Sequence, residues 1–217
     1  MGAKTWMLVY SKSDVGAVLK AAPPLDRAAT EAFVRQLFPK ETLTPLEDGS
    51  LDFTCPPDDE LVVGCFGELA IVAAKEFAID KPSKLPSHFL DLAGGRTVHL
   101  HAMHSVVDWL AFAVWQGGVL QRALSLSPDD GILEDQGPRL PFELPFWDGR
   151  HPATDPDDED DEDDAYPFCF HPLELGEAAL LAFFGYQLEG MVVPDSVDAG
   201  AVPMMRFTRE KRRWWKW

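Results

Sequence analysis

Residues 97–127 have the clearest hydrophobic pattern of the chain, and this pattern predicts three consecutive strands. In residues 97–104 the side chains alternate in direction, so that Val98 and Leu100 share one face. Residues 107–115 are apolar on both faces, and this strand should therefore lie in the middle of a sheet covered on both sides. Gly117 and Gly118 then supply a two-residue hairpin turn before the third strand.

This turn sets an expected register for the second and third strands. Counting outward from it places Trp115 opposite Leu120 and Ala113 opposite Arg122 on one face. The same count gives five further pairs, which are Ala111 with Leu124, Trp109 with Leu126, Val114 with Gln121, Phe112 with Ala123 and Leu110 with Ser125.

The other elements follow from shorter patterns. Apolar runs flanked by turn residues predict strands at 5–10, 60–66 and 69–74. Apolar residues at helical spacing predict helices at 26–38, 86–93 and 172–184. The first and last of these are the two main helices, and proline-rich, irregular backbone is expected beyond residue 127.

Strands with interspersed helices, several hairpins and few long crossovers are typical of an α+β fold. We therefore expect a mostly antiparallel sheet of about five to seven strands with the two main helices packed on it. Residues 1–205 should form a single domain, followed by a separate C-terminal tail at 206–217.

Charge is concentrated in two segments of opposite sign. The formal net charge is −17, and residues 155–164 carry nine acidic side chains and no basic one. Such a run repels itself, so it predicts a disordered acidic loop near residues 153–165. Elsewhere 27 acidic residues stand against 19 basic ones, which disfavours nonspecific binding to nucleic acid or anionic lipid over most of the surface.

The tail at 206–217 is basic and rich in tryptophan. Interleaved cations and indoles bind phosphates, stack on bases or insert at a membrane interface. We expect the tail to dock on its own chain or on a second copy through the acidic loop, with a protein partner, nucleic acid or a membrane as alternatives. The candidate interaction residues are Arg212, Arg213, Trp214, Trp215 and Trp217.

The sequence predicts a cytoplasmic protein without a transmembrane segment. Its three cysteines are widely spaced and form no Cys-x-x-Cys pair, which argues against a disulfide framework or a structural zinc site. Residues 1–10 are typical of a strand and not of a secretion signal. No window reaches the ~18 apolar residues that a bilayer requires.

His99, His101 and His104 form the one group of metal-type side chains that the pattern brings together. On a strand His99 and His101 point to the same face, where two imidazoles can share a metal such as zinc. His104 and Asp108 would complete the ligand set if the chain bends after the strand, since simple alternation places both opposite His99. We expect structural histidines beneath a helix or loop; a metal site and a small-ligand pocket remain alternatives.

A second candidate is the segment 125–134. Ser127, Asp129 and Asp130 lie where a strand runs into a loop, a common place for functional residues. Ser-Pro-Asp-Asp-Gly is also ordinary turn chemistry, and a structural turn is the reading we favour.

Five segments resemble those of an uncharacterised family of actinobacterial cytoplasmic proteins. They are 2–10 (GAKTWMLVY), 42–51 (TLTPLEDGSL), 98–115 (VHLHAMHSVVDWLAFAVW), 124–147 (LSLSPDDGILEDQGPRLPFELPFW) and 171–190 (HPLELGEAALLAFFGYQLEG). The resemblance runs from Gly2 to about Val193 and implies one compact domain in an actinobacterial cytoplasm. It implies no catalytic residues, and the acidic run and the basic end look peculiar to this member.

No catalytic motif is present in the sequence. The chain has no Gly-x-Ser-x-Gly, no phosphate-binding loop and no Gly-x-Gly-x-x-Gly. We therefore expect a protein of unknown function that is not an enzyme and that acts by binding or interaction. The alternative is a metal-dependent hydrolase that uses the histidine cluster.

Overall fold

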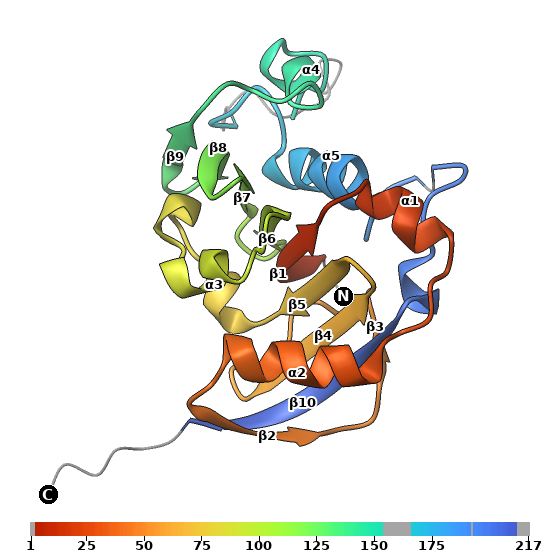
Figure 1. The fold of residues 1–217 in the computed structure, drawn as a ribbon. Coiled ribbons are helices and arrows are strands. Elements are labelled where there is room, and N and C mark those ends of the chain that lie inside the picture. Colours follow the sequence, from red (N-terminus) through yellow and green to blue (C-terminus); the bar gives the residue numbers. More distant parts are fainter. Residues whose placement is uncertain (1–2, 154–165, 192, 212–217) are drawn as a thin grey trace, which may run out of the picture.

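The computed structural model describes residues 3–153, 166–191 and 193–211, which are built around one ten-stranded sheet (Figure 1). The strands are β1 (Lys4–Ser11), β2 (Glu41–Pro45), β3 (Gly49–Ser50), β4 (Glu60–Phe66), β5 (Leu69–Ala73), β6 (Thr97–His104), β7 (Trp109–Gln116), β8 (Val119–Ser127), β9 (Gly131–Gln136) and β10 (Pro203–Lys211). Their order is β2-β10-β4-β5-β1-β6-β7-β8-β9, and β3 also pairs with β10. The strand pairs of this described part are antiparallel.

Short helices connect and cover the strands. They are α1 (Val15–Lys20), α2 (Arg27–Leu37), α3 (Ser87–Asp91), α4 (Leu144–Trp147) and α5 (Pro172–Phe184), with 3-10 turns η1 (Lys75–Phe77), η2 (Pro82–Lys84) and η4 (Ala199–Ala201). None of the helices in the described ranges has the length and apolar character that a membrane crossing requires.

The prediction of a mostly antiparallel sheet is confirmed, but the predicted number of five to seven strands is wrong. β9 was missed because Asp129, Asp130 and Gly131 are typical of a loop, and here they form the tight turn that starts this edge strand. β10 was missed because its end is basic and polar. The short strands β2 and β3 carry few apolar side chains, so their sequences give little strand signal.

The sheet is covered on both faces, and each face has its own apolar core. Met7 and Val9 of β1 point into one core with α1 and α5, whereas Leu8 and Tyr10 point into the other with α2 and α3. The two main helices therefore lie on opposite faces. In Figure 1, α2 crosses the strands near β4 and β10, and α5 lies beside β6 and α1.

The sequence defines both ends of α5, which packs on β6 and β7. His171 caps its first turn, with Nδ1 accepting from the Leu173 amide at 3.3 Å, and Pro172 fits the first helical position. Gly185 ends the helix in the left-handed conformation at φ 79°. A Cβ at Gly185 would lie 2.8 Å from the Gly16 Cα, so the end of α5 and the start of α1 approach closely because both residues are glycine.

The expected register of β7 and β8 is correct only next to the turn. Trp115 pairs with Leu120, but a bulge at Gln121 then shifts the register, so Val114 pairs with Arg122 and Phe112 with Leu124. The other predicted pairs are wrong by one residue for the same reason, because a bulge adds a residue to one strand only. It also turns Arg122 to the face opposite the one expected.

On that face the Arg122 side chain is fully buried and forms an ion pair with the equally buried Glu143. Arg122 Nε and Nη2 donate to the two Glu143 carboxylate oxygens at 2.9 and 2.7 Å. Arg122 also donates to the Asp135 carboxylate and to the carbonyl oxygens of Gln136 and Gly137. The bulge therefore directs one guanidinium at the segment after β9 and holds that segment on the sheet.

The boundary expected between domain and tail differs from the observed one, because β10 continues to Lys211. Arg206 donates to Glu60 at 2.7 Å, and the nearly buried Arg209 donates to both carboxylate oxygens of Glu76. The first half of the expected tail is thus part of the sheet. Residues 154–165 of the acidic loop expected near 153–165 lie outside the described residues, and so do the interaction residues Arg212, Arg213, Trp214, Trp215 and Trp217.

Candidate functional site

His99 and His101 project from β6 onto one face, as predicted, and both lie beneath α5. The His101 side chain is fully buried, and its Nε2 lies 3.0 Å from the Gly176 carbonyl oxygen. Because a carbonyl oxygen only accepts, Nε2 must carry the proton. The His99 ring lies 4.9 Å from the Phe183 ring, and burial lowers the pKa of each imidazole to about 4. The pair therefore packs as neutral, apolar-flanked histidines.

The other two candidate ligands lie elsewhere. His104 points to the opposite face of the sheet and stacks on Trp6, with the ring centroids 6.1 Å apart. Asp108 lies in the turn after β6, and its Oδ2 is 3.5 Å from His171 Nε2. The strand does not bend before His104, so alternation separates His104 from His99, and the four residues do not form one ligand set. Within the described ranges no three His, Cys, Asp or Glu side chains are grouped closely enough to hold a metal ion.

The segment 125–134 comprises the end of β8, the turn at 128–130 and the first part of β9. Ser127 Oγ accepts from the Asp130 amide at 3.1 Å, and Gly131 follows with φ 70°. Farther along β9, Glu134 accepts from the amide and hydroxyl of Ser83 at 2.9 and 2.5 Å and ties η2 to the sheet edge. The structural-turn reading is confirmed by these contacts.

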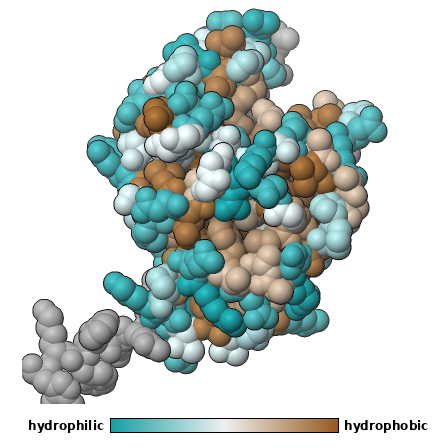
Figure 2. Space-filling view, in the orientation of Figure 1, coloured by the Kyte–Doolittle hydropathy of each residue, from teal (hydrophilic) through white to brown (hydrophobic). Residues whose placement is uncertain are grey.

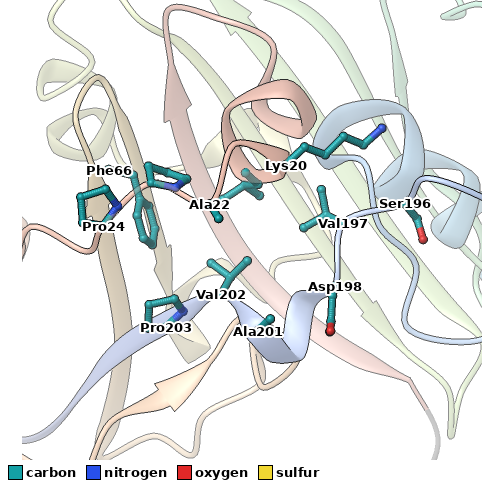
Figure 3. A pocket seen from close by; sticks show the side chains of 12 residues that line it. Lys20, Ala22, Pro24, Phe66, Ser196, Val197, Asp198, Ala201, Val202 and Pro203 are labelled. Atoms are coloured by element: carbon teal, nitrogen blue, oxygen red, sulfur yellow. The ribbon is translucent and has the colours of Figure 1, made fainter.

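A cavity of about 450 Å³ opens between the loop that follows α1 and the segment that leads into β10 (Figure 3). Sequence reasoning did not find it, because its two walls are more than 170 residues apart in the chain. Most of its lining is apolar, and the lining residues are Leu19, Lys20, Ala22, Pro23, Pro24, Phe66, Ser196, Val197, Asp198, Ala201, Val202 and Pro203.

Local chemistry fixes both walls of this cavity. Ala22 takes a left-handed conformation at φ 47°, and Pro23 and Pro24 then stiffen the turn toward α2. On the other wall the Val197 amide donates to the Gly185 carbonyl oxygen at 2.8 Å. Asp198 Oδ1 caps η4 by accepting from the Gly200 amide at 3.1 Å. The cavity is therefore bounded by constrained backbone on both sides.

The three polar side chains of the lining, Lys20, Ser196 and Asp198, are exposed or half-buried and lie at the rim of the cavity. Figure 3 shows Val197 and Val202 among the apolar side chains, while Lys20 extends away from them. Lys20 and Ser196 also line a neighbouring hollow of about 290 Å³, so they lie on the border between the two. Figure 2 shows hydrophobic surface reaching the exterior beside α1.

The residues that line the cavity include no histidine and no cysteine. These are the side chains that most often act as a general base or as an activated nucleophile near neutral pH. What the lining offers is an apolar surface with one cation and one carboxylate at the rim. This composition suits binding and orientation of a small molecule.

Comparison with protein-family models matches residues 5–207 to a family of unknown function, DUF6928. The match covers nearly the whole chain, so the protein belongs to this family. No curated protein and no solved structure matches the chain.

Proposed function

We propose that this DUF6928 protein is a non-catalytic binding protein that takes a small, mostly apolar molecule into the cavity between α1 and β10. The observation that carries the proposal is the cavity itself, with its apolar lining and its constrained walls. Its volume of about 450 Å³ lies in the range of known ligand pockets. Constrained walls favour binding because little conformational entropy is lost when the ligand enters.

The cavity can be tested with 1-anilinonaphthalene-8-sulfonate, a fluorescent probe with an apolar body and one anionic group. We expect the native protein to bind the probe with enhanced fluorescence, with the sulfonate near Lys20. Ala201→Trp places an indole at the cavity wall and should weaken binding at least about tenfold, a loss of roughly 1.4 kcal/mol.

The matched control is Ala32→Trp, which adds the same side chain at an exposed position of α2 that does not line the cavity. The control should bind the probe like the native protein, and both variants should keep the native melting temperature within a few degrees. Equal probe affinity in all three proteins would overturn the proposal, as would a native protein that does not bind the probe.

We also propose that the acidic segment 155–164 and the basic end 212–217 mediate self-association or contact with a protein partner. The support is their charge, because the first carries nine acidic residues and the second carries Arg212, Arg213 and Lys216. A chain ending at Lys211 keeps β10 intact. It should sediment as a smaller species at low salt than the full chain. Unchanged sedimentation together with loss of heparin binding would favour nucleic acid instead.

A cytoplasmic location is part of this proposal. Its support is the state of the cysteines, since Cys55, Cys65 and Cys169 are all free. Unpaired cysteines suit a reducing compartment. Alkylation of intact cells before lysis should label the exposed Cys169 as a thiol, and recovery of Cys169 in a disulfide would contradict the location.

A further inference from the structure

A third hollow, also of about 290 Å³, lies at the end of the sheet beside the β8–β9 turn, where it is bordered by residues of β6, β7 and β8. Its position follows from the register, because His104 pairs with Trp109 across β6 and β7 and with Lys4 across β6 and β1. The hollow thereby combines three aromatic rings with charges of both signs. The residues lining it are Trp6, Lys75, Ala78, Asp80, His104, Val107, Trp109, Ser127, Asp129 and Asp130.

Trp109 provides an unused hydrogen-bond donor at this hollow. Its side chain is only 8% exposed, and its Nε1–H has no acceptor within the described residues. A buried donor without an acceptor destabilises a fold by roughly 1–3 kcal/mol. In Trp6, by contrast, the indole N–H donates to the Pro56 carbonyl oxygen at 3.2 Å. An acceptor on a ligand that reaches this N–H from the hollow would satisfy it.

A positive charge is held at the same place. Lys75 Nζ lies 4.3 Å from the centre of the Trp6 ring, a cation–π contact that restricts the ammonium group. His104 stacks on Trp6, and burial, followed by the charges of Lys4 and Lys75, lowers its pKa. The imidazole is thus neutral near pH 7. Lys75 and the Trp109 N–H together suit a carboxylate.

Two carboxylates supply the opposite charge. Asp80 and Asp129 are exposed, and neither forms a hydrogen bond or an ion pair with another described residue. Asp130 is used internally, since its Oδ2 accepts from the Ser127 hydroxyl at 3.1 Å. Asp80 and Asp129 are therefore available to an ammonium group.

We propose that this hollow is a second binding site, independent of the apolar cavity, for a small zwitterion with one ammonium and one carboxylate group, the chemistry of a free amino acid. The ammonium binds near Asp80 and Asp129, and the carboxylate binds Lys75 and the Trp109 N–H. The volume of about 290 Å³ lies at the lower limit of known ligand pockets and therefore suits a small molecule of this size.

The test is calorimetric titration of the full chain with each of the twenty common L-amino acids. Putrescine, propionate and methyl glucoside serve as comparators that offer only a cation, only an anion or only hydroxyl groups. We expect at least one amino acid to bind about tenfold more tightly than every comparator. Tighter binding of a comparator would overturn the zwitterion, and no binding of any amino acid at about 10 mM would overturn the site.

Two variants test the two halves separately. Asp129→Asn removes a negative charge from the side of the hollow that binds the ligand's ammonium group. Lys75→Met removes the positive charge from the side that binds its carboxylate, and each variant should bind about tenfold more weakly. Asp91→Asn, at an exposed carboxylate of α3, is the matched control and should bind normally. Ala201→Trp should also bind normally, so failure of this site is distinguishable from failure of the apolar cavity. Full affinity in Asp129→Asn and Lys75→Met would overturn the assignment.

Discussion

At the scale of single residues, burial shifts the pKa of several side chains, lowering it for bases and raising it for acids. His99 and His101 are held neutral beneath α5. Glu177 of α5 is also mostly buried, and this burial raises its pKa to about 7, although its carboxylate accepts from the Leu188 and Glu189 amides. Both effects couple folding to pH, in opposite directions.

Stability should fall in mild acid because of His101. Its folded pKa of about 4 lies below the ordinary value of 6.5, so the unfolded chain binds the proton more tightly. The contribution of neutral His101 to the free energy of unfolding is complete above pH 6.5. It is lost as the pH falls toward 4, by roughly 1 kcal/mol per pH unit at most. Urea unfolding of His101→Gln between pH 7 and pH 4.5 should show a shallower decline than the native protein, and parallel curves would contradict this account.

Glu177 should have the reverse effect. Its folded pKa of about 7 lies above the ordinary 4.5, so its contribution to stability is complete below pH 4.5 and is lost as the pH rises through 7. Glu177→Gln keeps an acceptor for the Leu188 amide but cannot ionise. This variant should gain stability relative to the native protein between pH 5 and pH 8, measured by denaturant midpoints. A constant difference across that range would show that ionisation of Glu177 is not coupled to folding.

At the scale of elements, sequence reasoning succeeded where the signals are local. Asp26 caps α2, accepting from the Ala29 amide at 2.9 Å, and Gly185 ends α5, as their positions in the sequence predict. The bulge at Gln121 was not predicted, because counting outward from the turn assumes unbroken pairing, whereas Arg122 turns to the face where it meets Glu143, 21 residues farther along the chain. The sequence predicted that His99 and His101 share a face, but not which helix covers them, because α5 is some 70 residues away along the chain.

The buried ion pair of Arg122 and Glu143 should be strongly coupled. Both side chains are 0% exposed, so Glu143→Ala removes the one fully buried partner of Arg122 and leaves it with the partly exposed Asp135 carboxylate, which should destabilise the fold by roughly 3 kcal/mol. Replacing both residues, as Arg122→Met with Glu143→Leu, should recover most of that loss, because Asp135 is exposed enough to remain hydrated. Urea unfolding of the two single variants and the double variant measures the coupling. Additive losses would mean that the pair does not act as a unit.

At the scale of the whole molecule, the sheet separates two apolar cores, and its strand order joins segments that are far apart in the sequence. β10 comes from the far end of the sequence and inserts between β2 and β4. The apolar cavity lies where this late segment meets the loop after α1. The apolar cavity and the hollow beside the β8–β9 turn each combine residues that are distant in the chain. The sequence therefore shows which side chains are present but not that they lie together. The turn at Ser127 and Asp130 could be predicted because its hydrogen bonds are local in the sequence.

The junction of α1 and α5 should control both stability and the apolar cavity. Gly185→Ala places a Cβ 2.8 Å from the Gly16 Cα and strains a backbone at φ 79°. Gly149→Ala has nearly the same strain, at φ 73°, but its Cβ would meet nothing within 4 Å. We expect Gly149→Ala to destabilise the fold by about 1 kcal/mol, and Gly185→Ala by a further 1–3 kcal/mol or so from overpacking.

The same comparison links packing to binding. The Gly185 carbonyl oxygen accepts from the Val197 amide, and Val197 lines the apolar cavity. Displacing α1 from α5 should therefore move one wall of the cavity, and Gly185→Ala should weaken binding of the anilinonaphthalene probe while Gly149→Ala leaves it unchanged. Equal probe affinity in the two variants, with the expected difference in stability, would mean that the cavity wall is held by η4 alone and not by the α1–α5 junction.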